Sequence, residues 1–152
     1  MNESKTQRFL LLAGRLAGMQ LDDPDAFSVM HDLGSMTLTK HGQPFFDRLL
    51  IYQVEPVLAR FLYSPEAECR RAALYTLICY WGLDTYVRLC KEMLTSDPDS
   101  SVRMTAAICL GDFYRHTHDT EVVALLKTRM QDGKEEELVR DAARAALRIV
   151  LS

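Results

Sequence analysis

Residues 96–113, SDPDSSVRMTAAICLGDF, decide the fold class of this chain. The stretch begins with an acidic corner in which Asp97 can cap a helix and Pro98 suits the first helical turn. Apolar residues then recur at spacings of three and four, which is the period of one helix face. The stretch therefore predicts a helix that runs to about Arg115, and its small apolar residues predict close packing against another helix.

The same pattern occurs twice more along the chain. Residues 64–81, SPEAECRRAALYTLICYW, match it at an offset of 33 residues, and residues 135–151, EEELVRDAARAALRIVL, match it at an offset of 37. The three copies place an arginine in one column, at Arg70, Arg103 and Arg140, with an alanine three residues later. A period of this length is typical of stacked helical repeats. Each copy also follows an amphipathic segment, and the last of these segments, residues 119–131, begins with Asp119 as its predicted helix cap. We therefore expect three helix pairs, at residues 45–82, 83–116 and 117–152.

The middle copy resembles a known repeat family. Its cap, its Val-Arg pair, the following alanine and the Leu-Gly pair, as in DPDSSVRMTAAICLG, resemble a HEAT repeat of the short prokaryotic type. The resemblance implies an all-α fold, a HEAT-like α-solenoid of about three helix pairs. The outer copies match only in part, because the first has Cys69 in place of valine and the third has the longer corner QDGKEEE. The resemblance indicates architecture rather than activity, since one fold serves many functions.

Residues 1–44 fit the repeat pattern less clearly. We expect them to form N-terminal capping helices, because the terminal unit of a stack has to shield its open end. A degenerate first repeat is the alternative. Together with the three repeats they are expected to form a single domain over residues 1–152, a common length for one domain.

The composition of the chain disfavours several classes of partner. A net charge of −3 and a pI near 5.8 give no general attraction for phosphate backbones or anionic lipid. The apolar run FLLLAG near the N-terminus is too short to span a membrane. The four cysteines, at positions 69, 79, 90 and 109, show no metal-ligand spacing and are expected to be buried reduced thiols. We therefore expect a cytoplasmic protein without a cofactor or metal.

Two polar groups invite a functional interpretation. The arginine column at Arg70, Arg103 and Arg140 could bind anions, but the family resemblance implies a structural ladder in which the guanidinium groups bond corner acids or carbonyls. His116 and His118, together with Asp119, could hold a metal ion. We favour solvated loop histidines, because two residues of spacing in a loop is a weak metal signal. No nucleophile motif or phosphate loop is present in the sequence, and we expect no catalysis.

The most promising feature is one face of the second helices of the repeats. It gathers residue types that are enriched at protein interfaces, with arginines at the rim. The predicted partner-binding residues are Arg71, Tyr75, Ile78, Trp81, Met104, Ile108, Tyr114 and Arg115. The alternative is that this ridge is covered within the chain, by Phe27, Val29, Met30, Phe45 and Phe46.

We therefore expect a non-catalytic module that binds a partner protein or peptide, by analogy a dedicated bacterial partner such as an immunity protein or a secretion chaperone. One alternative is a small HEAT-like enzyme or metal protein that uses His116 and His118. Self-association through the ridge is another. A third is nucleic-acid binding through an arginine track, made of Arg70, Arg71, Arg103, Arg140, Arg144 and Arg148.

Overall fold

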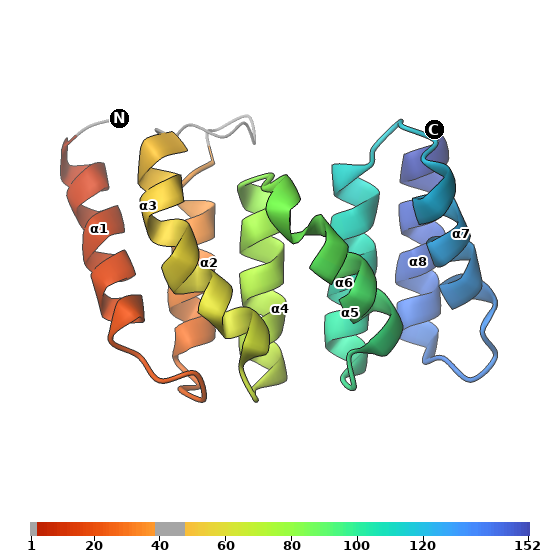
Figure 1. Cartoon of the computed structure of the whole chain (residues 1–152), viewed down its shortest axis with the longest axis horizontal. Coiled ribbons are helices and arrows are strands. Elements are labelled where there is room, and N and C mark those ends of the chain that lie inside the picture. The colour runs from red at the N-terminus through yellow and green to blue at the C-terminus, as the bar shows by residue number, and fades with distance from the viewer. Residues whose placement is uncertain (1–2, 39–47) are drawn as a thin grey trace. The chain divides into compact units, whose positions relative to one another are not determined.

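The computed structural model of the chain describes residues 3–38 and 48–152, and the described part is built from helices. Figure 1 shows their order along the chain. The α-helices are α1 (Glu3–Ala17), α2 (Ala26–Ser35), α3 (Arg48–Ala59), α4 (Ala67–Tyr75), α5 (Val87–Ser96), α6 (Ser100–Phe113), α7 (Thr120–Gln131) and α8 (Glu137–Leu151). Short turns extend three of them, namely η1 (Arg60–Tyr63) after α3, the π-helical η2 (Thr76–Tyr80) after α4, and η3 (Asp84–Tyr86) before α5.

The contacts between helices divide the chain into two compact units, Met1–Gly82 and Leu83–Ser152, hereafter unit 1 and unit 2. The division falls where the sequence places the boundary between the first and second repeats. The expectation of a single domain stays a prediction, and each unit is described by itself.

Unit 1 contains α1 to α4. Helix α2 packs against α4, and α1 packs against both α2 and α3. Helix α2 therefore occupies the position of a second helix, beside α4, although residues 1–44 match the repeat pattern poorly. The core of the unit is made of fully buried side chains from all four helices and η1, among them Phe9, Leu16, Met30, Leu33, Leu58, Phe61 and Leu74.

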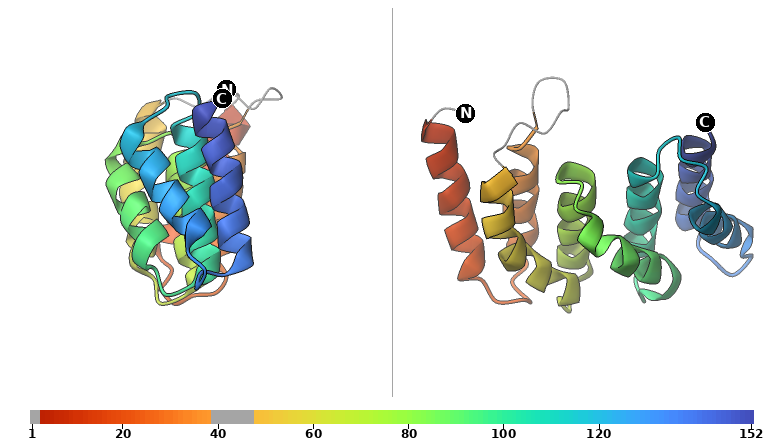
Figure 2. Two further views of the ribbon diagram at one scale, coloured as in Figure 1. Left: turned by 90° about the vertical axis from the view of Figure 1, so that its right-hand side faces the viewer. Right: turned by 45° about the horizontal axis from the view of Figure 1, so that its top comes forward.

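Unit 2 contains α5 to α8 and has the regular pairing that the sequence predicts. Helix α5 packs on α6, α7 packs on α8, and the second helices α6 and α8 pack directly on each other. Figures 1 and 2 show α5 and α7 on one side of α6 and α8. The closest approach is at Gly111, where an added Cβ would lie 2.7 Å from the Cβ atom of Ala146. The small residues of the repeat pattern thus set the distance between these helices.

The structure confirms the predicted cap of α7, whereas the predicted cap of α6 is wrong. Asp119 caps α7 as predicted, since its side chain accepts a hydrogen bond from the backbone N–H of Val122 at 2.9 Å. Helix α6 is capped by Asp99 rather than Asp97, and it ends at Phe113 rather than near Arg115. The side chain of Asp97 instead accepts from the N–H of Asp99 at 2.9 Å, so the two acids share the corner.

Candidate functional site

In unit 1 the second-helix face is shaped by the π turn that ends α4. The backbone N–H of Trp81 donates to the carbonyl of Thr76 at 3.0 Å, a hydrogen bond across five residues instead of four. Such a turn holds one residue more than an α-helical turn, so the residues after it are rotated by about 100° from their α-helical positions. Side chains at positions 80 and 81 therefore point in directions that a helical wheel does not predict.

The rotation buries the tryptophan that the sequence places on the ridge. Trp81 is 2% exposed and its ring lies 6.3 Å from the ring of Phe9 in α1. Ile78 is also 2% exposed. Neither side chain is available to a partner in this structure. The ring found against Trp81 is that of Phe9, which is not among the residues expected to cover the ridge. Phe45 and Phe46 lie outside the described residues.

The same rotation brings Tyr80 to the surface beside Tyr75. The two rings meet edge to face, with centroids 5.1 Å apart, and Tyr80 makes a similar contact with His31 of α2 at 6.1 Å. Phe27 lies one turn before His31 on the same side of α2 and is 41% exposed. We call Phe27, His31, Tyr75 and Tyr80 the aromatic patch.

Glycine makes room for the aromatic patch. A Cβ atom on Gly34 of α2 would lie 2.9 Å from Cε2 of Tyr80 and 3.1 Å from Cγ2 of Thr76. Only a residue without a side chain lets the Tyr80 ring lie in this position against α2. Partial burial raises the pKa of Tyr80, with a smaller contribution from neighbouring Cys79, so the phenol stays neutral at physiological pH.

Arg71 lies at the edge of the aromatic patch on α4. It is partly exposed, and its guanidinium forms an ion pair with Glu68 at 3.0 Å. Glu68, Arg71 and Tyr75 follow one another at helical spacing, so they share one face of α4.

In unit 2 the second helices carry three apolar side chains that are at least partly exposed. Met104 and Ile108 of α6 are partly exposed, Ile108 to 41%, and Leu138 of α8 is exposed to the same extent. We call Met104, Ile108 and Leu138 the apolar patch. Ion pairs lie on the same two helices, between Arg115 and Asp112 at 3.3 Å and between Arg144 and Asp141 at 2.6 Å.

Tyr114 follows the last residue of α6 and lies beside α5. The ammonium group of Lys91 in α5 lies over its ring, 5.3 Å from the ring centroid. The N–H of Tyr114 still donates to the carbonyl of Leu110 at 3.0 Å, as in a regular helical turn, and the residue is partly exposed, so its role in binding stays a prediction. Burial opposes the charged form of Lys91, but hydrogen bonds to Tyr114 and Glu121 outweigh burial and raise the pKa of the lysine.

The cleft beside Lys91 has a volume of about 380 Å³ and lies between α5 and α7. It is lined by Arg88, Lys91, Glu92, Thr95, Ser96, Glu121 and Leu125. Lys91 and Glu121 neutralise each other at 3.2 Å. The cleft therefore presents balanced charges rather than a cluster that would select a ligand.

Two arginines of the column donate hydrogen bonds to the corners between helices. Nη1 of Arg70 donates to the carbonyl of Ser64 at 3.0 Å, and Nη1 of Arg103 donates to the carbonyl of Asp97 at 2.7 Å. Each arginine thus reaches the carbonyl six residues earlier. Arg140 follows a longer corner, and its buried Nε has no hydrogen-bond partner among the described residues.

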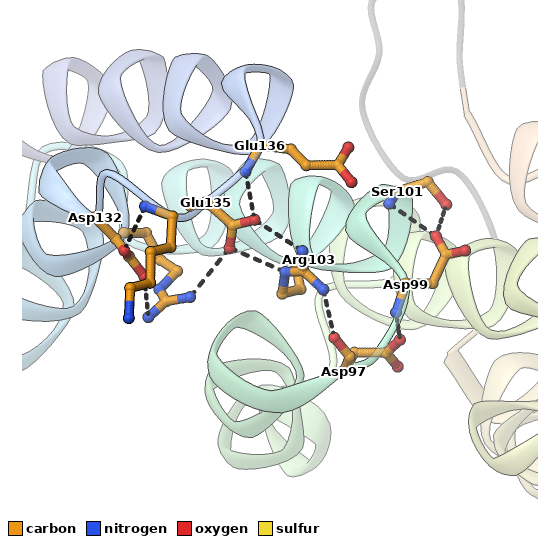
Figure 3. Close-up of polar contacts among 9 residues, drawn as sticks. Asp97, Asp99, Ser101, Arg103, Asp132, Glu135 and Glu136 are labelled. Atoms are coloured by element: carbon orange, nitrogen blue, oxygen red, sulfur yellow. Dashed lines mark hydrogen bonds and ion pairs between the residues drawn. The ribbon is translucent and has the colours of Figure 1, made fainter.

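Arg103 also anchors a buried ion network in unit 2 (Figure 3). It holds the carboxylate of Glu135 through two hydrogen bonds, of 2.9 Å and 2.8 Å, and Arg129 adds a third at 3.0 Å. The side chain of Glu135 is 2% exposed. The hydrogen bond from Arg103 is the main reason that the pKa of Glu135 is lowered, and the same bond raises the pKa of Arg103. We call Arg103, Glu135 and Arg129 the ion network.

The two loop histidines form backbone hydrogen bonds with the C-terminal end of α8. His116 and His118 have positive φ angles, of 62° and 56°, in the left-handed region that only a minority of non-glycine residues adopt. Their backbone N–H groups donate to the carbonyls of Ile149 and Val150, both at 3.1 Å. Nδ1 of His116 lies 2.8 Å from Oγ of Ser152. Over residues 3–38 and 48–152, no group of three His, Cys, Asp or Glu side chains is placed to hold a metal ion.

A family model for HEAT repeats matches residues 54–148. The chain belongs to the HEAT-repeat family. HEAT repeats generally mediate contacts between proteins and typically act as scaffolds rather than catalysts. Comparison with curated proteins and with solved structures gave no match. Within the described part of the chain, none of the HEAT helices has the length and apolar character that crossing a membrane requires.

For these HEAT repeats, the sequence predicts eight ridge residues on the second helices. In the structure Arg71, Tyr75, Met104, Ile108, Tyr114 and Arg115 are at least partly exposed, whereas Ile78 and Trp81 are buried. Phe27, His31 and Tyr80 were missed. The helical spacing of Phe27 and His31, followed by Gly34, could have predicted the α2 side of the aromatic patch. The periodicity of the sequence does not predict the π turn at the end of α4.

Proposed function

We propose that the protein is a non-catalytic binding module that holds a partner protein or peptide against its second-helix faces. The observation that carries the proposal is the exposure of aromatic and aliphatic side chains on second helices of both units, in the aromatic patch and the apolar patch. Exposed apolar and aromatic groups that cluster on one face are typical of protein interfaces. The predicted binding residues are Tyr75, Met104 and Ile108, with Arg71 and Arg115 at the edges.

The charge pattern of these helices supports a protein partner over nucleic acid. The arginine track needs free guanidinium groups, because binding to phosphates depends on positive charge that is not already neutralised. Arg71 and Arg144 are paired with carboxylates on their own helices, and Arg103 is held by Glu135. Carboxylates therefore neutralise three of the six arginines of the track.

The enzyme and metal alternatives have less support than binding. The backbone N–H groups of His116 and His118 are bonded to the end of α8, and the cleft between α5 and α7 holds balanced charges. By analogy with immunity proteins and secretion chaperones, we propose that the partner is a single protein that this module serves.

The test is capture of a partner from the lysate of the source cells, identified by mass spectrometry. We expect the parent chain to retain a protein that is lost with Ile108→Glu or with Tyr75→Ala. Tyr63→Ala is the matched control, because Tyr63 is 73% exposed and lies on η1, outside both patches. Circular dichroism melts have to show that each variant folds as the parent does. Capture that neither patch variant weakens would refute the proposal.

A further inference from the structure

One side of α1 packs into unit 1, and its other side exposes leucine side chains. Figures 1 and 2 show α2 and α3 on the same side of α1. Phe9, Ala13 and Leu16 are buried, whereas Leu11 is 74% exposed and Leu10 is 45% exposed. A partner that covers an exposed leucine removes apolar surface from water, and this favours binding.

Gly14 is a helical glycine that the packing of the chain does not explain. Glycine in a helix interior lowers stability relative to alanine, so it calls for a packing or functional reason. Gly34 and Gly111 have such a reason, because an added Cβ atom would overlap a neighbouring residue. An added Cβ atom on Gly14 would meet no atom within 4 Å, and one on Gly18 would meet only carbonyls of α1 itself. The exposed side of α1 therefore leaves room for a second helix to approach closely, as Gly111 does for α8.

Two arginines lie on the same side of α1 as these glycines. Arg8, Leu11, Arg15 and Gly18 follow one another at spacings of three, four and three residues, which places them on one side of the helix, with Gly14 beside them. We call these five residues the α1 face. Both arginines are exposed, and neither forms an ion pair or a side-chain hydrogen bond with any residue in the described part of the chain. Their guanidinium groups are therefore available to carboxylates of another molecule.

The charge argument depends on where these arginines lie, because the charge of unit 1 as a whole is close to zero. Glu3, in the first turn, is the only carboxylate in the sequence of α1. The acidic corner that follows α1, residues 21–25, contacts the corner before α4. At the C-terminal end of α1, Nη2 of Arg60 donates to the carbonyls of Leu16 and Ala17, at 3.3 Å and 3.5 Å. This third guanidinium group offsets the partial negative charge of the helix end, so the end of α1 near Arg15 does not repel an acidic partner.

We propose that the α1 face binds an acidic amphipathic helix of a partner protein. Gly14 and Gly18 admit the backbone of that helix, and Leu11 packs against its apolar side. Arg8 and Arg15 pair with carboxylates along its edges, since a planar guanidinium group matches a carboxylate and such pairs fix the register of two helices. A lipid surface fits this face less well, because a helix that inserts into lipid presents bulky apolar side chains where α1 has glycines. The inference goes beyond the proposed function, since it adds a third contact surface to the two patches.

The test uses the full chain and three synthetic helical peptides. Each peptide has three repeats of the heptad Leu-Ala-Gln-Ala-Xaa-Gln-Xaa, in which Xaa is glutamate, glutamine or lysine and flanks the apolar side of the helix. Binding is followed by NMR through the backbone amide resonances of residues 8–18. We expect the glutamate peptide to bind about fivefold more tightly than the glutamine peptide, which is the effect of two exposed ion pairs, and the lysine peptide to give no shift. The advantage of the glutamate peptide is expected to shrink in 1 M salt, where the Debye length is about 3 Å.

Matched variants separate docking from folding. Gly14→Leu adds a side chain where the chain itself has room, so its thermal stability is expected to equal or exceed that of the parent, because leucine favours a helix over glycine. The same side chain holds a docking helix away, so we expect the glutamate peptide to bind about fivefold more weakly or less. Arg8→Gln together with Arg15→Gln is expected to abolish the preference for glutamate over glutamine. Arg88→Gln is the control, because the Arg88 side chain is 92% exposed and lies on α5 of unit 2.

Three results overturn the inference. The first is a glutamate peptide that does not bind, or that binds no more tightly than the glutamine or lysine peptide. The second is binding that Gly14→Leu or the double arginine variant leaves unchanged, and the third is a peptide that shifts only resonances outside α1. The proposed function is tested at Tyr75 and Ile108, which lie outside the α1 face, so its failure and the failure of this inference are measured separately.

Discussion

The buried carboxylate of Glu135 gives the sharpest test of how unit 2 is held together. It accepts two hydrogen bonds from Arg103, one from Arg129 and one from the N–H of Glu136 at 2.8 Å. Glu135→Gln keeps the volume of the side chain and removes its charge. The two guanidinium groups then lose their counter-charge while their side chains are only 15% and 16% exposed.

The magnitude follows from the burial of the three groups. Removing one partner of a fully buried ion pair typically costs about 3 to 5 kcal/mol, because an uncompensated charge stays behind. The partial exposure of Arg103 and Arg129 lets water recover some of this energy, so we expect a loss of about 2 to 3 kcal/mol. That is a large part of the roughly 5 to 15 kcal/mol that stabilises a typical protein.

Urea denaturation of the full chain, followed by circular dichroism, measures the change in the free energy of unfolding. Glu137→Gln is the control, because Glu137 is exposed in the first turn of α8, and we expect it to change the stability by less than about 0.5 kcal/mol. Equal effects of Glu135→Gln and Glu137→Gln would refute the claim that the ion network stabilises the corner.

The lowered pKa of Glu135 also predicts how the stability difference between the parent and Glu135→Gln depends on pH. A carboxylate whose folded pKa lies below its unfolded value contributes stability above the unfolded pKa, near 4.3, and loses it as the pH falls through the folded pKa. The stability difference between the parent and Glu135→Gln should therefore be constant from about pH 5.5 to 8 and shrink in more acidic solution. A difference that grows toward low pH would contradict this account.

The two close-packed glycines give the remaining predictions. Gly111→Ala would place its Cβ 2.8 Å from the Cα of Ala146, and the backbone cannot move aside as a side chain can. We therefore expect urea denaturation to show a loss of about 1 to 3 kcal/mol in the free energy of unfolding. Unchanged stability would show that α6 and α8 are not in this contact. Gly34→Ala instead meets the ring of Tyr80, which can move, so we expect a smaller loss of stability together with altered Tyr80 and His31 ring resonances in NMR spectra. Tyr80 and His31 resonances that match those of the parent would contradict the placement of Tyr80 against α2.

Much of the fold could be predicted because the information is local and repeated. The Arg103 and Ala106 columns and the Asp119 cap each depend on neighbours within a few positions. The structure places both columns in helices and Asp119 at the start of α7, as expected. Glu135 could not be predicted to join the ion network. It lies 32 residues from Arg103, in a corner longer than those of the other copies, and its burial depends on how that corner folds.

The misplacement of Trp81 has one physical origin, which is the assumption that helical phase continues unchanged to the end of the second helix. In α4 the chain stays helical but changes its hydrogen-bond register at Thr76, and one extra residue per turn exchanges the positions of Tyr80 and Trp81 relative to the core. Periodicity reports which residues share a face only while the register is constant. A register change is decided by tertiary packing, here by whether Trp81 can reach Phe9 and whether Gly34 admits Tyr80, and it converts an expected tryptophan ridge into a tyrosine and histidine patch.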